Sequence, residues 1–144
     1  MRSETRQGTR AVVGWLERVD VLSRASRESL SRVARVARIH EVGPGHAICR
    51  QGEEPEAMWV VLDGQVRLEQ DGEEIDTLGP GQAVGAWSLL EPAPNIASVT
   101  AVERCRLLRV ACTSYRQLDG RDDIERSIRG VIRERLLALA GAGG

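Results

Sequence analysis

The sequence predicts an α+β fold that is mainly β: an antiparallel, double-stranded jelly-roll-like β-roll, flanked by N-terminal helices and a long C-terminal helix. Turn signals recur about every 7–12 residues between short apolar segments from residue 39 to residue 110, a spacing typical of sandwiches and rolls. Apolar residues at helical spacing precede this region and return after residue 122.

Length and composition indicate one soluble domain. The chain has 144 residues, of which 42% are hydrophobic and 28% are charged, enough to bury a core without disulfide bonds. We expect residues 1–19 to form an N-terminal helical extension and residues 20–144 to form the domain proper. No apolar run approaches the roughly 18 residues of a membrane span, and the N-terminus lacks the apolar centre of a signal peptide. The expectation is a cytoplasmic protein without membrane insertion.

The three cysteines support the same location. Cys49, Cys105 and Cys112 are odd in number, have no metal-like spacing and lie among apolar, strand-like residues. Buried, reduced thiols acting as small hydrophobic side chains are the favoured interpretation, and they fit a reducing compartment.

Two helices are predicted before the roll. The first lies between residues 11 and 19, and Ser26 is expected to cap the second. Residues 1–40 hold nine arginines against four acids, 9 − 4 = +5, whereas residues 41–144 hold eleven against seventeen, 11 − 17 = −6. The basic excess indicates a solvated helix face in preference to a surface for an acidic partner.

The roll is predicted from alternating segments between turns. Asp71-Gly72 is a strong hairpin signal, and Ile75 is expected to point inward on the returning strand. Residues 52–56 form an acidic loop, a short helix follows Thr113, and the last helix covers about residues 122–140. The predicted strands are 46–50, 58–62, 65–70, 73–78, 96–102 and 105–110.

The stretch from Gly79 to Ala101 organises the rest of the chain. Gly79, Gly81 and Gly85 precede a short helix over residues 86–91, and a loop framed by prolines leads into a strand. Glycine permits close backbone approach, and the first turn of a helix presents free N–H groups to an anion. The stretch is interpreted either as an anion cradle or as a tight turn that packs a hydrophobic knob.

This layout resembles the cyclic-nucleotide-binding domain of bacterial regulators related to the cyclic-AMP receptor and of kinase regulatory subunits. The resemblance covers roughly residues 20–140. Residues 84–90, Val-Gly-Ala-Trp-Ser-Leu-Leu, match the first half of the family's phosphate-binding cassette, and residues 94–99, Pro-Asn-Ile-Ala-Ser-Val, match the second. The resemblance implies a ligand site that comprises Gly85, Ala86, Trp87, Ser88, Asn95, Ile96, Ala97 and Ser98.

The sequence departs from the family at the two charged positions of the cassette. Ala86 stands where the family has a glutamate for the ribose hydroxyl, and Asn95 stands where it has an arginine for the cyclic phosphate. A charge-assisted hydrogen bond is worth about 1.5–3 kcal/mol, so losing both contacts weakens binding by roughly two to four powers of ten. Trp87 either fills the emptied pocket or packs in the core, and packing is favoured.

The preferred function is a non-catalytic regulatory or interaction module that has lost tight binding of cyclic AMP and cyclic GMP. The alternative is a sensor for a cyclic nucleotide or another nucleotide, with Arg104 or Arg106 supplying charge. A metal enzyme is disfavoured because His40 and His46 are interpreted as surface residues. No nucleophile and base pair stands out, so we expect no catalytic residue, no metal and no cofactor other than a weakly bound cyclic nucleotide.

The last helix is expected to mediate homodimerisation. Ile128, Ile132, Leu136 and Leu139 lie close to one line along it, and in the resembling family this helix is the usual dimer seam. The alternative is a helix that folds back on its own roll. The resemblance implies no direct DNA binding, since the chain ends at Gly144 without a helix-turn-helix. We expect the module to act through a protein partner or a fused domain.

Overall fold

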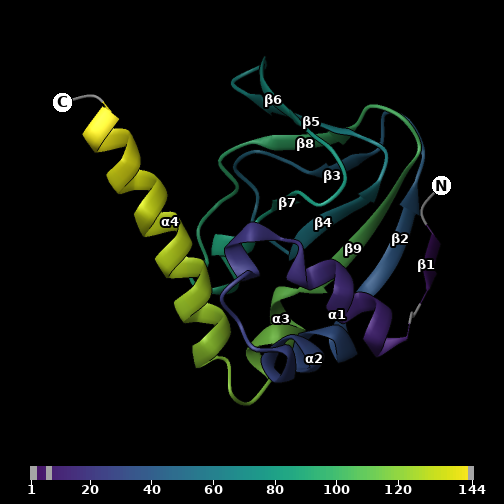
Figure 1. Cartoon of the computed structure of the whole chain (residues 1–144). Coiled ribbons are helices and arrows are strands. Elements are labelled where there is room, and N and C mark those ends of the chain that lie inside the picture. The colour runs from purple at the N-terminus through teal and green to yellow at the C-terminus, as the bar shows by residue number, and fades with distance from the viewer. Residues whose placement is uncertain (1–2, 6–7, 143–144) are drawn as a thin grey trace.

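The computed structural model describes residues 3–5 and 8–142. Its strands form two antiparallel sheets that face each other as a roll (Figure 1). The larger sheet has the order β1 (Ser3–Thr5), β2 (Arg38–Val42), β9 (Cys105–Ala111), β4 (Ala57–Asp63), β7 (Ala83–Val84). The smaller sheet has the order β3 (Ala47–Cys49), β8 (Ser98–Ala101), β5 (Val66–Gln70), β6 (Glu73–Leu78). The predicted α+β roll is confirmed.

Helices cover one side of the larger sheet and extend from the end of the roll (Figure 1). The predicted cap of the second helix is confirmed, because the Ser26 Oγ accepts a hydrogen bond of 3.1 Å from the Ser29 backbone N–H. The helical elements are α1 (Thr9–Glu17), η1 (Asp20–Leu22), α2 (Arg27–Val36), η2 (Ala86–Leu89), α3 (Cys112–Arg116) and α4 (Asp122–Ala142).

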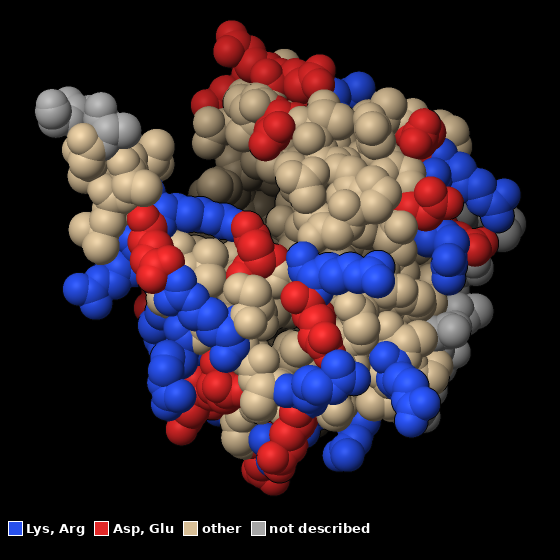
Figure 2. Space-filling view, viewed as in Figure 1, with Lys and Arg blue, Asp and Glu red and all other residues tan. Residues whose placement is uncertain are grey.

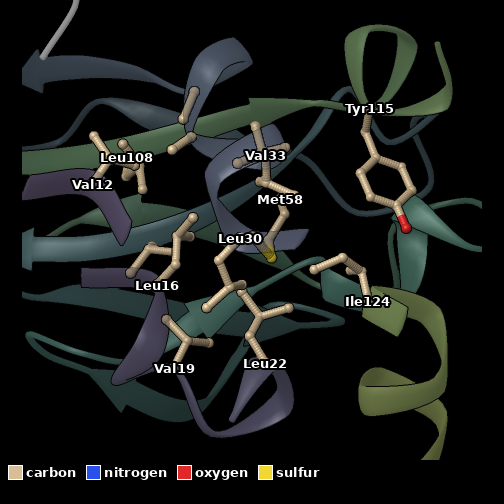
Figure 3. Close-up of a cluster of buried hydrophobic side chains, with 14 of the residues drawn as sticks. Val12, Leu16, Val19, Leu22, Leu30, Val33, Met58, Leu108, Tyr115 and Ile124 are labelled. Carbon is tan, nitrogen blue, oxygen red and sulfur yellow. The ribbon is translucent and has the colours of Figure 1, made fainter. Parts of the chain in front are cut away.

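Alternation along the central strands divides the core into two clusters. On β4, Met58 and Val60 face the helices, whereas Trp59 and Val61 face the inside of the roll. Figure 3 shows Met58 and Leu108 of the larger sheet among side chains of α1, α2 and α4. The α1 side chains belong to this helix-side cluster, so the first predicted helix shares the core of the roll. The division at residue 19 remains a prediction.

The first half of α4 is hydrogen-bonded to the segment that joins α1 to α2. Ile124 and Ile128 are fully buried in the helix-side cluster. The Ser127 hydroxyl donates to the Val21 carbonyl at 2.8 Å and accepts from the Arg24 backbone N–H at 3.1 Å. Beyond this anchor α4 projects away from the roll (Figure 1), and it carries three exposed leucines, Leu136, Leu137 and Leu139.

Two expectations about the roll are wrong, and a third holds only in part. Ile75 lines a cavity inside the roll but is 52% exposed, because residues 73–77 of β6 lie in an exposed hairpin edge. His40 is buried, since it alternates with Val42 toward the roll interior. The strand expected from Ile96 begins at Ser98, and Ile96 itself is exposed. The Asp71-Gly72 hairpin is confirmed, with both residues at positive φ.

Candidate functional site

A cavity of about 690 Å³ lies inside the roll and opens to solvent beside the cassette. Figure 2 shows a hollow in the surface between the projecting helix α4 and the roll. The cavity is lined by β3, β4, β7, η2 and the loop that follows η2. Its apolar wall includes Ile48, Trp59, Leu68, Leu78, Val84 and Val99.

Gly85 sets the position of η2 against β4. It has φ of +81°, and a Cβ atom there would lie 2.8 Å from the Ala57 carbonyl oxygen. Only glycine accepts both conditions without strain. The cassette backbone therefore runs directly against the strand that forms the cavity floor.

The short helix η2 has one buried face and one face at the cavity. Leu89 is buried in the helix-side core, and the Ser88 carbonyl accepts a 3.2 Å hydrogen bond from the Arg116 guanidinium of α3. Trp87 lines the cavity and is 40% exposed. The expectation that Trp87 packs in the core is therefore wrong, because the neighbouring Leu89 fills that place.

Asn95 connects the cassette loop to the segment after β3. Its side-chain N–H donates to the Arg50 carbonyl at 2.9 Å, and its backbone N–H donates to the Glu53 carbonyl at 2.9 Å. The Ser98 hydroxyl oxygen accepts a 2.9 Å hydrogen bond from the Gln51 backbone N–H. Two of the polar side chains predicted to hold a ligand, Asn95 and Ser98, are thus engaged in hydrogen bonds that hold residues 50–53.

The remaining predicted site residues lie around the same opening. Gly85, Ser88, Ile96 and Ala97 line the cavity together with Trp87 and Asn95. Ala86 and Ser98 do not line it, although both flank residues that do. The sequence therefore identified the cassette region, but not which of its side chains face the space.

Carboxylates on the cavity wall are the feature that the sequence analysis missed. Five acidic residues line it against a single arginine, Arg50. Burial raises the pKa of the Cys49 thiol, which also lines the cavity, and the charges of Glu53 and Glu56 raise that pKa further. The acidic loop at residues 52–56 was the sequence signal for these residues. The loop had no assigned role, because only strand pairing between distant segments places it at the opening of the cavity. The acidic residues are Glu53, Glu54, Glu56, Asp76 and Glu91.

An aromatic and basic cluster supports the floor of the cavity from inside the roll. The His40 ring meets the Trp59 ring edge-on at a centroid distance of 5.4 Å. The Arg109 guanidinium lies 5.5 Å from the Trp59 ring centroid and 3.8 Å from the Glu56 carboxylate. Such a stack holds the indole in one orientation.

Arg104 and Arg106 do not supply charge to the cavity. Their guanidinium groups lie 3.1 Å and 3.8 Å from the Glu41 carboxylate, and neither residue lines the cavity. The hypothesis that they supply charge to the cavity is wrong, since both pair with Glu41 of β2 instead.

The described residues contain neither a metal-type cluster nor a helix suited to a membrane. Within residues 3–5 and 8–142, no three His, Cys, Asp or Glu side chains gather as a metal site would require. Over the same ranges, none of the helices combines the length and the apolarity that crossing a membrane needs.

Comparison with known families identifies the fold of this site. The model of the family described as "Cyclic nucleotide-binding domain" matches residues 39–121, which include the roll, the cassette and α3. The chain belongs to the cyclic nucleotide-binding domain family.

Three relatives illustrate the range of the cyclic nucleotide-binding domain family. A cAMP-dependent protein kinase regulatory subunit of Yarrowia lipolytica is 30% identical over 92 residues, which cover 62% of this chain and 24% of that protein. The regulatory domain of Toxoplasma gondii PKA with cAMP has a TM-score of 0.71 at 23% identity, covering 82% and 47% of the two chains. The sensor domain of the transcriptional regulator DNR from Pseudomonas aeruginosa has a TM-score of 0.73 at 18% identity, covering 92% and 93%.

These relatives share the β-roll and serve regulatory roles, as the family assignment implies. The chain spans about a quarter of the length of the Yarrowia lipolytica protein. The solved structures are less than 25% identical to it, so they support the fold alone.

Proposed function

We propose that this protein is a non-catalytic regulatory module whose cavity has lost tight binding of cyclic AMP and cyclic GMP. The observation that most directly supports this proposal is the environment of Asn95. It stands where the family has its phosphate-binding arginine, and its amide N–H is engaged with the Arg50 carbonyl. The cassette therefore offers neutral groups where a cyclic phosphate requires a cation.

The second departure acts in the same direction. Ala86 has no polar atom for a ribose hydroxyl, whereas the family glutamate at this position accepts a hydrogen bond. The loss of a charge-assisted contact at each position weakens affinity by roughly two to four powers of ten. The five carboxylates on the cavity wall add repulsion toward a bound phosphate.

Calorimetry with cyclic AMP and cyclic GMP tests this proposal. The expected result is no binding, or a dissociation constant above about 10 μM, and a submicromolar value for either nucleotide contradicts the proposal. The double variant Ala86→Glu with Asn95→Arg restores the family's charges and is expected to gain measurable affinity. Asn95→Ala is the matched control: it also releases the Arg50 carbonyl but adds no cation, and should gain none.

The cavity itself favours a second candidate function, a sensor for a different ligand. A space of about 690 Å³ lies within the range of small-molecule sites, and a module that acts only through its outer surface has no use for it. Calorimetry with a panel of cyclic mono- and dinucleotides tests whether another nucleotide is the ligand. Heat from a member other than cyclic AMP or cyclic GMP supports the sensor.

We also propose that α4 mediates homodimerisation. Ile128 is buried in its own chain, so the free surface begins near the half-buried Ile132 and continues through the exposed Leu136 and Leu139. Two copies that meet along this end of α4 cover surface that a monomer leaves in water.

Sedimentation velocity at tens of micromolar tests the dimer. Ile132→Glu is expected to give a monomer, and Leu136→Glu repeats the test at an exposed position where unfolding is not a concern. Arg126→Glu, exposed near the start of the same helix, is the control that should leave the dimer intact. A monomeric unmutated protein at every concentration refutes the proposal.

The proposal places the module in the cytoplasm, with its signal passed to a protein partner or a fused domain. It includes no direct contact with DNA. Figure 2 supports this part, because the arginines on the face shown are interspersed with acidic side chains and form no continuous basic stripe.

A further inference from the structure

The charge of the cavity wall indicates the chemical class of its ligand, an inference that rests on the sensor function proposed above. Five acidic residues and one arginine line the cavity, a formal charge of −4 when His46 is neutral. The carboxylates come from three separate parts of the chain: the segment after β3, strand β6 and the loop after η2. An anion that enters this space meets like charge from several sides, whereas a cation meets opposite charge.

Arg109, which does not line the cavity, offsets only part of this charge. It stacks on Trp59 and lies 3.8 Å from Glu56, which accounts for one of the five acidic residues. Of the others, Glu53 accepts a hydrogen bond from the Asn95 backbone N–H at its carbonyl, Glu91 follows η2, and both residues are exposed. Their charge is therefore available at the opening of the cavity.

The rest of the wall suits the body of an organic ligand. Trp87 presents a partly exposed indole at the cavity, and the face of an indole attracts ammonium groups, quaternary ones included. Below it, Ile48, Leu68 and Val84 provide a half-buried apolar surface. An acidic opening, an exposed indole and an apolar interior together match a cation that carries an apolar or aromatic group.

We propose that the cavity binds an organic cation, a primary or quaternary amine with an apolar body, in place of a cyclic nucleotide. The carboxylates of Glu53 and Glu91 attract the charged group, and the Trp87 indole contacts it. The apolar body occupies the space between Leu68 and Val84.

Cys49 allows the field in the cavity to be measured without knowledge of the ligand. It is half-buried at the cavity wall, whereas Cys105 and Cys112 are buried in the core. The reagents are two methanethiosulfonates, one with a trimethylammonioethyl group and one with a sulfonatoethyl group. In each case the thiolate attacks the sulfenyl sulfur, a mixed disulfide forms and methanesulfinate leaves, so only the charge of the reagent differs.

The readout is the ratio of the two rates at Cys49, divided by the same ratio for 2-mercaptoethanol and followed by mass spectrometry. We expect the cationic reagent to be favoured at least tenfold, and the double variant Glu53→Gln with Glu91→Gln to remove most of this preference. Glu28→Gln, on α2 and outside the cavity, should leave it unchanged, and Cys49→Ser should not be labelled. A normalised ratio near one, or in favour of the anion, overturns the proposal.

Binding is tested with benzyltrimethylammonium, its uncharged carbon isostere neopentylbenzene, and cyclic AMP, all followed by tryptophan fluorescence. The cation is expected to bind at least tenfold more tightly than the isostere, more weakly at high salt, and with a smaller fluorescence change in Trp87→Phe. Equal binding of the isostere overturns the proposal, as does no binding of the cation below 10 mM. Submicromolar binding of cyclic AMP instead contradicts the proposed function itself, so the two failures are distinguishable.

Discussion

The two faces of the larger sheet differ in how completely they are covered. On the helix side, Met58 and Leu108 have no exposed surface, because α1, α2 and α4 pack directly over them. On the roll side, the floor residue Trp59 is also buried, but Leu68 and Val84 around it are only half-buried and line the cavity. The same strands thus carry a closed core on one face and an open cavity on the other.

The largest expected effect is on the closed face. Leu108→Ala leaves a void among side chains that cannot move in to fill it, and should lower the free energy of unfolding by about 2–5 kcal/mol. Leu68→Ala makes the same change beside the cavity, where water already reaches, and should cost less than about half as much. Urea denaturation of the two variants measures the difference, and equal losses would remove the distinction between the faces.

A smaller effect is expected where the cassette meets the floor of the cavity. Gly85→Ala forces a Cβ against the Ala57 carbonyl at positive φ, which should cost roughly 1–3 kcal/mol. Gly79→Ala is the matched control, since a Cβ there meets nothing within 4 Å, and it should be neutral or slightly stabilising. Thermal unfolding compares the two, and equal melting temperatures would contradict the close approach.

The smallest effect concerns the polar contacts at the edge of the closed face. The Ser26 backbone N–H donates to the Asp123 carboxylate at 2.7 Å, and this bond, with help from Ser29, lowers the pKa of Asp123 below its usual 3.8. A lowered folded-state pKa gives stability that is present above pH 3.8 and is lost as the pH falls through the folded value. The group is largely exposed, so the contribution is less than about 1 kcal/mol.

The measurement is the stability difference between the protein and Asp123→Asn at pH 7 and at pH 2.5. The difference should shrink at the lower pH, because the carboxyl is then protonated in the unfolded state and increasingly protonated in the folded state. Asp122→Asn, the exposed neighbour, is the matched control. A difference for Asp123→Asn that grows on acidification would reverse the assigned direction.

Much of this architecture followed from local patterns. The turn at Asp71-Gly72, the cap at Ser26 and the strand from residue 105 are short-range features, and each was predicted. His40 and Trp87 were misplaced for one shared reason. Residue spacing shows that a strand or helix has two faces but not what covers each face, and that covering depends on segments distant in the sequence.

The sequence by itself determined that the chain forms a glycine-punctuated roll and that Ala86 and Asn95 stand in the stretch that resembles the cassette, because these are properties of residue type and spacing. The tertiary structure alone decided that Asn95 is engaged with the Arg50 carbonyl and that acids from three segments converge on one cavity. Those facts depend on strand pairing between positions far apart in the chain. No local pattern connects these charges, and they come together only when the chain folds.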